Sequence, residues 1–227
     1  MQHYQIIEEK LERFIKKFYV SLLIKGALLF VGLSLLLFIF GAALEYFLWF
    51  DASFRTVLFW SIIALELVLF SKWILLPLSQ LFKLSKGINY DEASSQIGAH
   101  FPEVSDKLKN ILQLKAQGAE DELILASIEQ KSKDLKPIPF QMAIDFKQNL
   151  KYSRFLAIPI LVLVAIWVSG FGESFSYSYK RIVNYSTEYE APAPFQFSIL
   201  NPELQTKKGQ SFQLKVTTTG EIKPEDV

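Results

Sequence analysis

The sequence predicts a mainly α-helical membrane protein with three transmembrane helices, a small cytoplasmic helical bundle and the start of a periplasmic, immunoglobulin-like β-sandwich domain. Three long apolar runs each provide the roughly 20 helical residues needed to cross a hydrocarbon core of about 30 Å. Basic residues are unequally shared between the segments that join these runs. Beyond the third run, apolar residues alternate with polar ones, which is the period of β-strands.

The chain begins with a predicted amphipathic helix, residues 1–25. Over residues 4–24, apolar side chains that include Phe14 and Phe18 recur at helical spacing on one side. Acidic residues precede basic ones by four positions on the other side, which supports a helix. We expect this helix either to lie along the cytoplasmic face or to run directly into the first span. Its simplest role is a juxtamembrane anchor, and partner binding is the alternative.

Residues 26–82 form a predicted transmembrane hairpin, with spans over about 26–48 and 56–78. The first span contains 19 consecutive uncharged residues, Gly26–Leu44. The second ends or kinks at Pro77, which has no N–H to donate to the helix. Aromatic residues gather at the span ends, where amphipathic rings favour the headgroup level.

Glu66 is the acidic residue that lies deep within the second predicted span. A carboxylate at that depth costs on the order of a few kcal/mol unless it is protonated or paired. Two interpretations are open: a hydrogen bond to another helix of this chain or of a partner, and a step in an ion or proton pathway. The other spans carry no acid, base or broken half-helix that matches Glu66, so we favour an intramembrane polar contact.

Residues 83–154 are polar and helical, and they predict a small cytoplasmic bundle. The first helix covers Glu92–His100, and the second begins at Pro102, a favoured first-turn residue. The remaining boundaries follow from breaks at Gly118, Pro137 and Pro139, so that a third helix opens at Asp121 and a fourth covers Phe140–Tyr152.

This bundle has apolar stripes but little apolar mass, so it would be marginally stable alone. We expect it to dock onto lipid, the N-terminal helix or a partner protein. The candidate partner-docking side chains are Phe14 and Phe18 of the N-terminal helix, with Phe101, Val104, Leu108 and Leu112 of the bundle.

Residues 155–172 are the third predicted span, 18 residues without a charge. Pro159 lies one turn into this span, where a missing N–H is tolerated near a helix start. Residues 173–227 then open a β-sandwich, because two segments alternate apolar and polar residues on either side of a turn at Lys208–Gly209. Two strands do not make a stable domain, so we expect a longer protein. The alternating positions are Phe195, Phe197 and Ile199, then Phe212, Leu214 and Val216.

Loop charge predicts the orientation of the spans. Residues 1–25 carry five Lys and Arg, and residues 72–154 carry twelve, whereas the 45–55 hairpin carries only Arg55. Because basic loops stay in the cytoplasm, we expect the N-terminus and the bundle to be cytoplasmic. The 45–55 hairpin and the C-terminus then lie outside. An outer segment without cysteine is compatible with a bacterial envelope, and we expect it to lie in the periplasm, with the spans in the inner membrane.

The residue types of common active sites do not come together in this sequence. Cysteine is absent, and His3 and His100 have no metal-ligand spacing to carboxylates. Ser105 and Asp106 follow His100, but their place in the first turn of a helix favours capping. We therefore predict no enzyme, no cofactor, no metal site and no small-molecule substrate. A net charge of +1 gives no indication of nucleic-acid binding.

Several stretches resemble an uncharacterised family of large Bacteroidetes membrane proteins, grouped under a domain of unknown function. They include Glu45–Trp49, Asn89–Ser94, Ile97–Leu108, Leu125–Lys131 and Ala193–Phe197, and the most specific is His-Phe-Pro-Glu-Val-Ser-Asp-Lys-Leu at 100–108. The resemblance covers essentially the whole chain. It implies a three-span inner-membrane anchor with a very long periplasmic region, and it implies no catalytic residues.

Together these features favour a non-enzymatic anchor or accessory subunit of a multi-protein membrane complex. Its partners would be the lipid bilayer and other inner-membrane proteins, with a translocase or insertase of protein export or envelope biogenesis as the expected setting. The alternative is a transmembrane signal transducer between a periplasmic sensor region and a cytoplasmic regulator.

Overall fold

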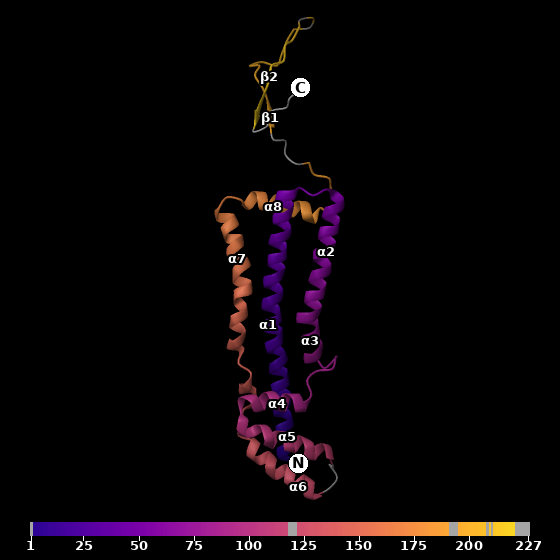
Figure 1. Ribbon diagram of the computed structural model, residues 1–227, viewed down its shortest axis with the longest axis vertical. Coiled ribbons are helices and arrows are strands. Elements are labelled where there is room, and N and C mark those ends of the chain that lie inside the picture. The colour runs from indigo at the N-terminus through magenta and orange to yellow at the C-terminus, as the bar shows by residue number, and fades with distance from the viewer. Residues whose placement is uncertain (1, 118–121, 191–194, 208, 210, 221–227) are drawn as a thin grey trace.

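The computed structural model describes residues 2–117, 122–190, 195–207, 209 and 211–220. Within these ranges the chain is mainly helical, with three helices long and apolar enough to span a membrane and a two-stranded sheet. The long helices stand side by side, a bundle of short helices lies at one end of them, and α8 lies across the other (Figure 1). We call the end remote from the bundle the distal end.

Helix α1 runs unbroken from Gln2 to Leu48, 47 residues, or about 70 Å at 1.5 Å per residue. Of the two expected arrangements of the N-terminal helix, the structure has the one in which it continues directly into the first span. Residues 2–25 contain neither Gly nor Pro, so nothing in the sequence interrupts the helix before Gly26.

The bundle packs around the first half of α1. Its helices are α4 (Tyr90–His100), α5 (Pro102–Gln117) and α6 (Glu122–Leu135), while the expected break at Gly118 and start at Asp121 lie outside the described residues. Asn89 caps α4 by accepting from the Glu92 amide, and the Glu92 side chain accepts from the Asn89 amide in return. The core consists of Tyr4, Ile7, Leu11 and Phe14 of α1 with Ala93, Ile97, Val104, Leu108, Ile111, Ile128, Leu135 and Phe140.

The segment leading from the bundle into the third span differs from the fourth helix expected there. It forms two short 3₁₀ turns, η2 (Phe140–Ala143) and η3 (Phe146–Tyr152). The Asp145 side chain accepts from the Lys147 amide at 2.9 Å and so starts the second turn separately. Lys10 and Lys17 of α1 donate to the carbonyls of Ile138 and Gln141, which hold the segment against α1.

The second span is α2 (Ala52–Phe70), continued by one π-helical turn, η1 (Ser71–Leu75), and by α3 (Leu76–Leu81). Pro77 accounts for the π-turn, because it offers no N–H to the carbonyl of Trp73 four residues earlier. That carbonyl faces Gly26 of α1 so closely that a Cβ on Gly26 would lie 2.2 Å from its oxygen. Glycine is therefore required at this crossing.

The third span, α7 (Ser153–Val168), crosses α1 in the same way. Pro159 lies inside the helix and leaves the Phe155 carbonyl without its usual N–H donor. A Cβ on Gly32 of α1 would lie 2.3 Å from that oxygen. Pro77 and Pro159 thus each free a carbonyl, and a glycine of α1 lets its backbone approach that carbonyl, where a weak Cα–H donor can serve it.

Residues beyond α7 begin with a helix, whereas the sequence predicts only the start of a β-sandwich over residues 173–227. Helix α8 (Gly172–Val183) lies across the distal ends of the spans (Figure 1). Its apolar face packs on α1 through Phe175 and Tyr179, whose rings lie 5.7 and 4.8 Å from that of Phe38. An amphipathic helix in this position fits the plane of a membrane interface.

Two strands follow, β1 (Phe195–Ile199) and β2 (Val216–Gly220), which pair antiparallel with Ile199 opposite Val216. The first strand has its expected range, but the second begins where the expected strand over 212–216 ends. Asn201 explains the shift, because its side chain binds the Gln213 carbonyl at 2.8 Å and the Lys215 amide at 2.6 Å. Those backbone groups are then occupied by a side chain, and strand pairing starts one residue later.

Candidate functional site

The most distinctive polar site is a buried ion-pair cluster of Glu45, Arg55 and Arg181 at the distal end. A hairpin of three residues places the first two opposite each other, because Glu45 lies in the last turn of α1 and Arg55 in the first turn of α2. Asp51 caps α2 by accepting from the Phe54 amide at 2.7 Å.

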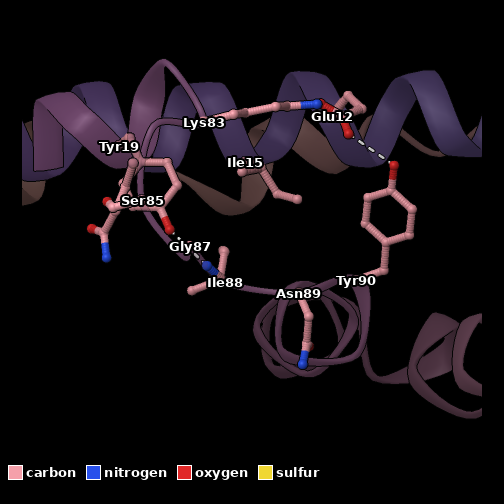
Figure 2. A pocket seen from close by; sticks show the side chains of 10 residues that line it. Glu12, Ile15, Tyr19, Lys83, Ser85, Gly87, Ile88, Asn89 and Tyr90 are labelled. Carbon is pink, nitrogen blue, oxygen red and sulfur yellow. Dashed lines mark hydrogen bonds and ion pairs between the residues drawn. The ribbon is translucent and has the colours of Figure 1, made fainter.

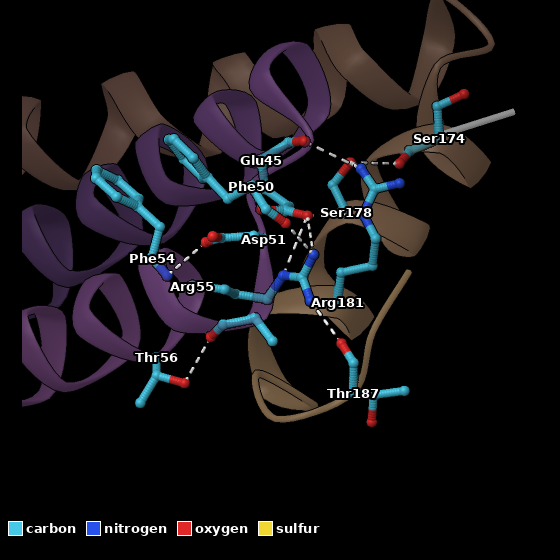
Figure 3. A network of polar contacts seen from close by, with 11 residues as sticks. Glu45, Phe50, Asp51, Phe54, Arg55, Thr56, Ser174, Ser178, Arg181 and Thr187 are labelled. Atoms are coloured by element: carbon cyan, nitrogen blue, oxygen red, sulfur yellow. Dashed lines mark hydrogen bonds and ion pairs between the residues drawn. The ribbon is translucent and has the colours of Figure 1, made fainter. Parts of the chain in front are cut away.

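One carboxylate oxygen holds the cluster together. Glu45 Oε1 lies 3.2 Å from Nε and 3.1 Å from Nη2 of Arg55, and 3.0 Å from Nε of Arg181 (Figure 3). Glu45 and Arg55 are fully buried, and Arg181 is 6% exposed. The three helices α1, α2 and α8 are thereby tied at a single atom.

Backbone carbonyls and aromatic rings complete the surroundings of both guanidinium groups. Arg55 Nη1 donates to the Thr187 carbonyl at 2.8 Å, and Arg181 Nη2 donates to the Glu45 carbonyl at 3.1 Å. The Arg181 guanidinium also stacks 3.6 Å above the Trp49 ring. Trp49 has a φ of +45°, a conformation that few residues other than glycine adopt, and its ring is held over Arg181.

The cluster carries one net positive charge, from two guanidinium groups and one carboxylate. Burial lowers the pKa of Arg181; the charge of Glu45 opposes this shift, and that of Arg55 adds to it. Arginine stays protonated in proteins, so the cluster is not an acid–base pair. Removing Glu45 from this cluster would leave two buried positive charges without a counter-charge, which is strongly destabilising.

The sequence pattern does not predict this cluster. It marks Arg55 only as a loop charge, and Arg181 falls in the segment 173–227, for which the sequence predicts the start of a β-sandwich. A usable signal was present: Phe175, Tyr179 and Ile182 recur at helical spacing just beyond the third span, which marks an interfacial helix.

Glu66, the predicted intramembrane polar contact, lies halfway along the second span. Ser34 of α1 donates its hydroxyl to Glu66 Oε2 at 2.6 Å. The two face an apolar groove of about 510 Å³ that includes Phe30, Phe38 and Phe59. The contact therefore joins two helices of the same chain, through a serine hydroxyl that is neither an acid, a base nor part of a broken half-helix.

We expect Glu66→Gln to preserve the α1–α2 contact, because the amide can accept from Ser34. Glu66→Leu should lower the free energy of unfolding by about 0.6–2 kcal/mol, the range of one membrane hydrogen bond. Denaturation in mixed micelles measures the difference, and Ser34→Ala is the matched control that should lose a similar amount. If Glu66→Gln instead abolishes function while the fold and assembly are intact, the proton-pathway interpretation gains the stronger support.

The predicted docking side chains lie mainly inside the chain's own core. Phe14, Val104 and Leu108 have no exposed surface, and Phe101 and Leu112 are partly buried against the same cluster. Phe18 is half-buried beside Tyr19. For the three buried side chains the docking role is corrected to packing between α1 and the bundle, because the N-terminal helix supplies the missing apolar surface.

A second set of polar contacts fastens the loop between α3 and α4 to α1. Lys83 and Tyr90 approach Glu12 from two segments, and each makes a 2.8 Å contact with its carboxylate (Figure 2). Lys83 lowers the pKa of Glu12, and burial together with Glu12 raises that of Tyr90. Tyr19 accepts from the Ile88 amide at 2.6 Å. A pocket of about 360 Å³ lies between α1 and this loop, and these contacts surround it.

His3 and His100 lie apart, His3 with Nδ1 2.7 Å from Glu129 Oε1 and His100 beside Phe101. In the part of the chain that the structure describes, no three His, Asp or Glu side chains are grouped to hold a metal ion. Comparison with protein-family models, curated proteins and solved structures finds no match to this chain.

Proposed function

We propose that the protein is a non-enzymatic anchor or accessory subunit of a multi-protein complex in a bacterial inner membrane. The observation that carries this proposal is the sharing of α1 between two sites. One half of α1 provides the core of the bundle, and its last turn provides Glu45 to the ion-pair cluster. Such a helix fixes the bundle to the distal surface, which is what an anchor between two compartments requires.

The setting we propose is protein export or envelope biogenesis, with a translocase or insertase as partner. The bundle faces the cytoplasm, and α8 and the β1–β2 hairpin face the periplasm as part of an arm with immunoglobulin-like character. The exposed apolar surface of the spans supports membrane insertion, since the most apolar stretch of the second span has no buried residue. Export as the setting rests on analogy with other anchored arms.

A signal transducer is the second candidate, and the π-turn Ser71–Leu75 favours it. Such turns often occur at functional sites in helices, and this one lies where the second span approaches Gly26 of α1. A shift of α3 there would move the loop that Lys83 and Tyr90 hold against α1.

Purification from the native membrane in mild detergent tests the proposed function. We expect stoichiometric integral membrane partners, and a translocase or insertase among them would support the anchor. A nucleotide-cycling regulator as the main partner would support the transducer. A chain that purifies alone and monodisperse from its native membrane would contradict both.

Orientation can be tested with two cysteine substitutions, because the chain contains no cysteine. Ser95 in α4 and Ser211 before β2 are both exposed. In intact spheroplasts, an impermeant maleimide should label Ser211→Cys and leave Ser95→Cys unlabelled until the membrane is opened. The reverse pattern would show that the bundle lies outside the cell.

A further inference from the structure

Two cavities of different chemistry adjoin at the distal corner between α1, α7 and α8. One is a groove of about 920 Å³, lined by aromatic rings and by the charged side chains of Lys180, Arg181 and Glu190, and the other is an apolar slot of about 240 Å³. Tyr46, Phe47 and Ser174 line both, so the two spaces are adjacent. A groove with charged side chains next to a wholly apolar slot matches a molecule with a charged headgroup and a hydrocarbon chain.

The groove carries surplus positive charge. Lys180 and Arg181 line it with Glu190, and behind Arg181 lie the buried Glu45 and Arg55. The positive charges of Lys180, Arg181 and Arg55 thus exceed the negative charges of Glu190 and Glu45 by one. Lys180 is exposed, and its ammonium group lies 5.6 Å from the centre of the Tyr177 ring at the edge of the groove, where a ligand can reach it. One phosphodiester would neutralise this surplus.

The slot is formed where a chain could enter from the hydrocarbon region. Ala43 of α1, Ile166 of α7 and Phe175 of α8 line it, and none of its exposed surface is polar. Ala43 lies near the end of the uncharged stretch Gly26–Leu44 of α1, and α8 crosses the distal ends of the spans (Figure 1). The slot therefore reaches into the apolar layer while the groove opens at headgroup level.

We propose that this corner binds one anionic phospholipid, with its phosphate beside Lys180 and Arg181 and an acyl chain in the slot lined by Ala43, Ile166 and Phe175. An anionic lipid is preferred to a zwitterionic one because only the former cancels the net charge of the groove. The inference rests on the membrane placement proposed above and goes beyond it, since a bilayer anchor needs no particular lipid.

Native mass spectrometry of the full chain, released from nanodiscs that contain equal phosphatidylglycerol and phosphatidylcholine, tests this site. We expect one phosphatidylglycerol to be retained in preference to phosphatidylcholine. Lys180→Gln should reduce that retention about fivefold, the factor that one lysine near an anionic lipid contributes. Ala43→Leu should fill the slot and reduce retention of both lipids.

Matched controls separate the site from general effects. Lys207→Gln removes an exposed lysine outside the groove, and Ala27→Leu adds the same bulk at an exposed position of α1. Neither should change retention. Equal retention of both lipids by the unaltered chain, or no effect of Ala43→Leu, would overturn the proposal, as would full displacement by soluble glycerol phosphate. Failure to insert into nanodiscs at all would instead count against the membrane anchor itself.

Discussion

Replacing Glu45 with alanine is expected to lower the free energy of unfolding by about 3–5 kcal/mol, the usual effect of removing one partner from a buried ion pair. The reason is that Oε1 of Glu45 contacts both Arg55 and Arg181, so its removal leaves two buried guanidinium groups facing each other. The loss should also free α8 from α1. Denaturation in mixed micelles measures the first effect, and hydrogen exchange at α8 measures the second.

Glu173 provides the matched control, because it is an exposed carboxylate in the first turn of α8. Glu173→Ala should change stability by less than about 1 kcal/mol, as exposed charges do. Glu45→Gln should fall between the two, since it keeps an acceptor but loses the charge. Equal effects of Glu45→Ala and Glu173→Ala would show that the cluster does not hold α8 in place.

The second large effect is expected at the glycine crossings. Gly32→Ala would place a Cβ 2.3 Å from the Phe155 carbonyl oxygen, and a backbone atom cannot rotate away. The helices must separate, at a cost of about 1–3 kcal/mol for overpacking, although alanine is the better helix former. Gly26→Ala should destabilise the protein by a similar amount, because its Cβ would clash with the Trp73 carbonyl.

Gly41 is the control on the same helix. A Cβ there would lie 3.1 Å from Cδ1 of Ile62, the far end of a flexible side chain that can move aside. Gly41→Ala should therefore be nearly neutral in the same denaturation experiment. If Gly32→Ala lowers the free energy of unfolding no more than Gly41→Ala does, then α1 and α7 do not approach each other as closely as the structure shows.

Much of the fold could be predicted because apolar runs and their periods are local signals. The three long apolar helices and β1 follow directly from length and alternation. The role of the prolines could not be predicted the same way. The sequence predicts only that Pro77 ends or kinks a span and that Pro159 is tolerated near a helix start. In the structure, the carbonyls that these prolines leave without a donor face Gly26 and Gly32, and that pairing depends on how the helices cross.

The ion-pair cluster was missed for a similar reason. Arg181 lies 136 residues beyond Glu45 in the sequence, and the three side chains meet only when α8 folds back over the ends of α1 and α2. For the predicted docking residues, the pattern was visible in the sequence but the partner surface was not. Phe14, Val104 and Leu108 have the pattern of an interface, and the structure supplies its other side from the same chain.

The continuity of α1 is the feature on which the proposed anchor depends, and one distance measures it. Gln5 and Phe40 are exposed positions of α1, 35 residues apart, and the absence of other cysteines allows spin labels at Gln5→Cys and Phe40→Cys. In nanodiscs, electron–electron double resonance should give a narrow distribution near 52 Å, at about 1.5 Å per residue. A distance near 37 Å, roughly that of a right-angle bend at Lys25, would place the first helix along the membrane surface and contradict a continuous anchor.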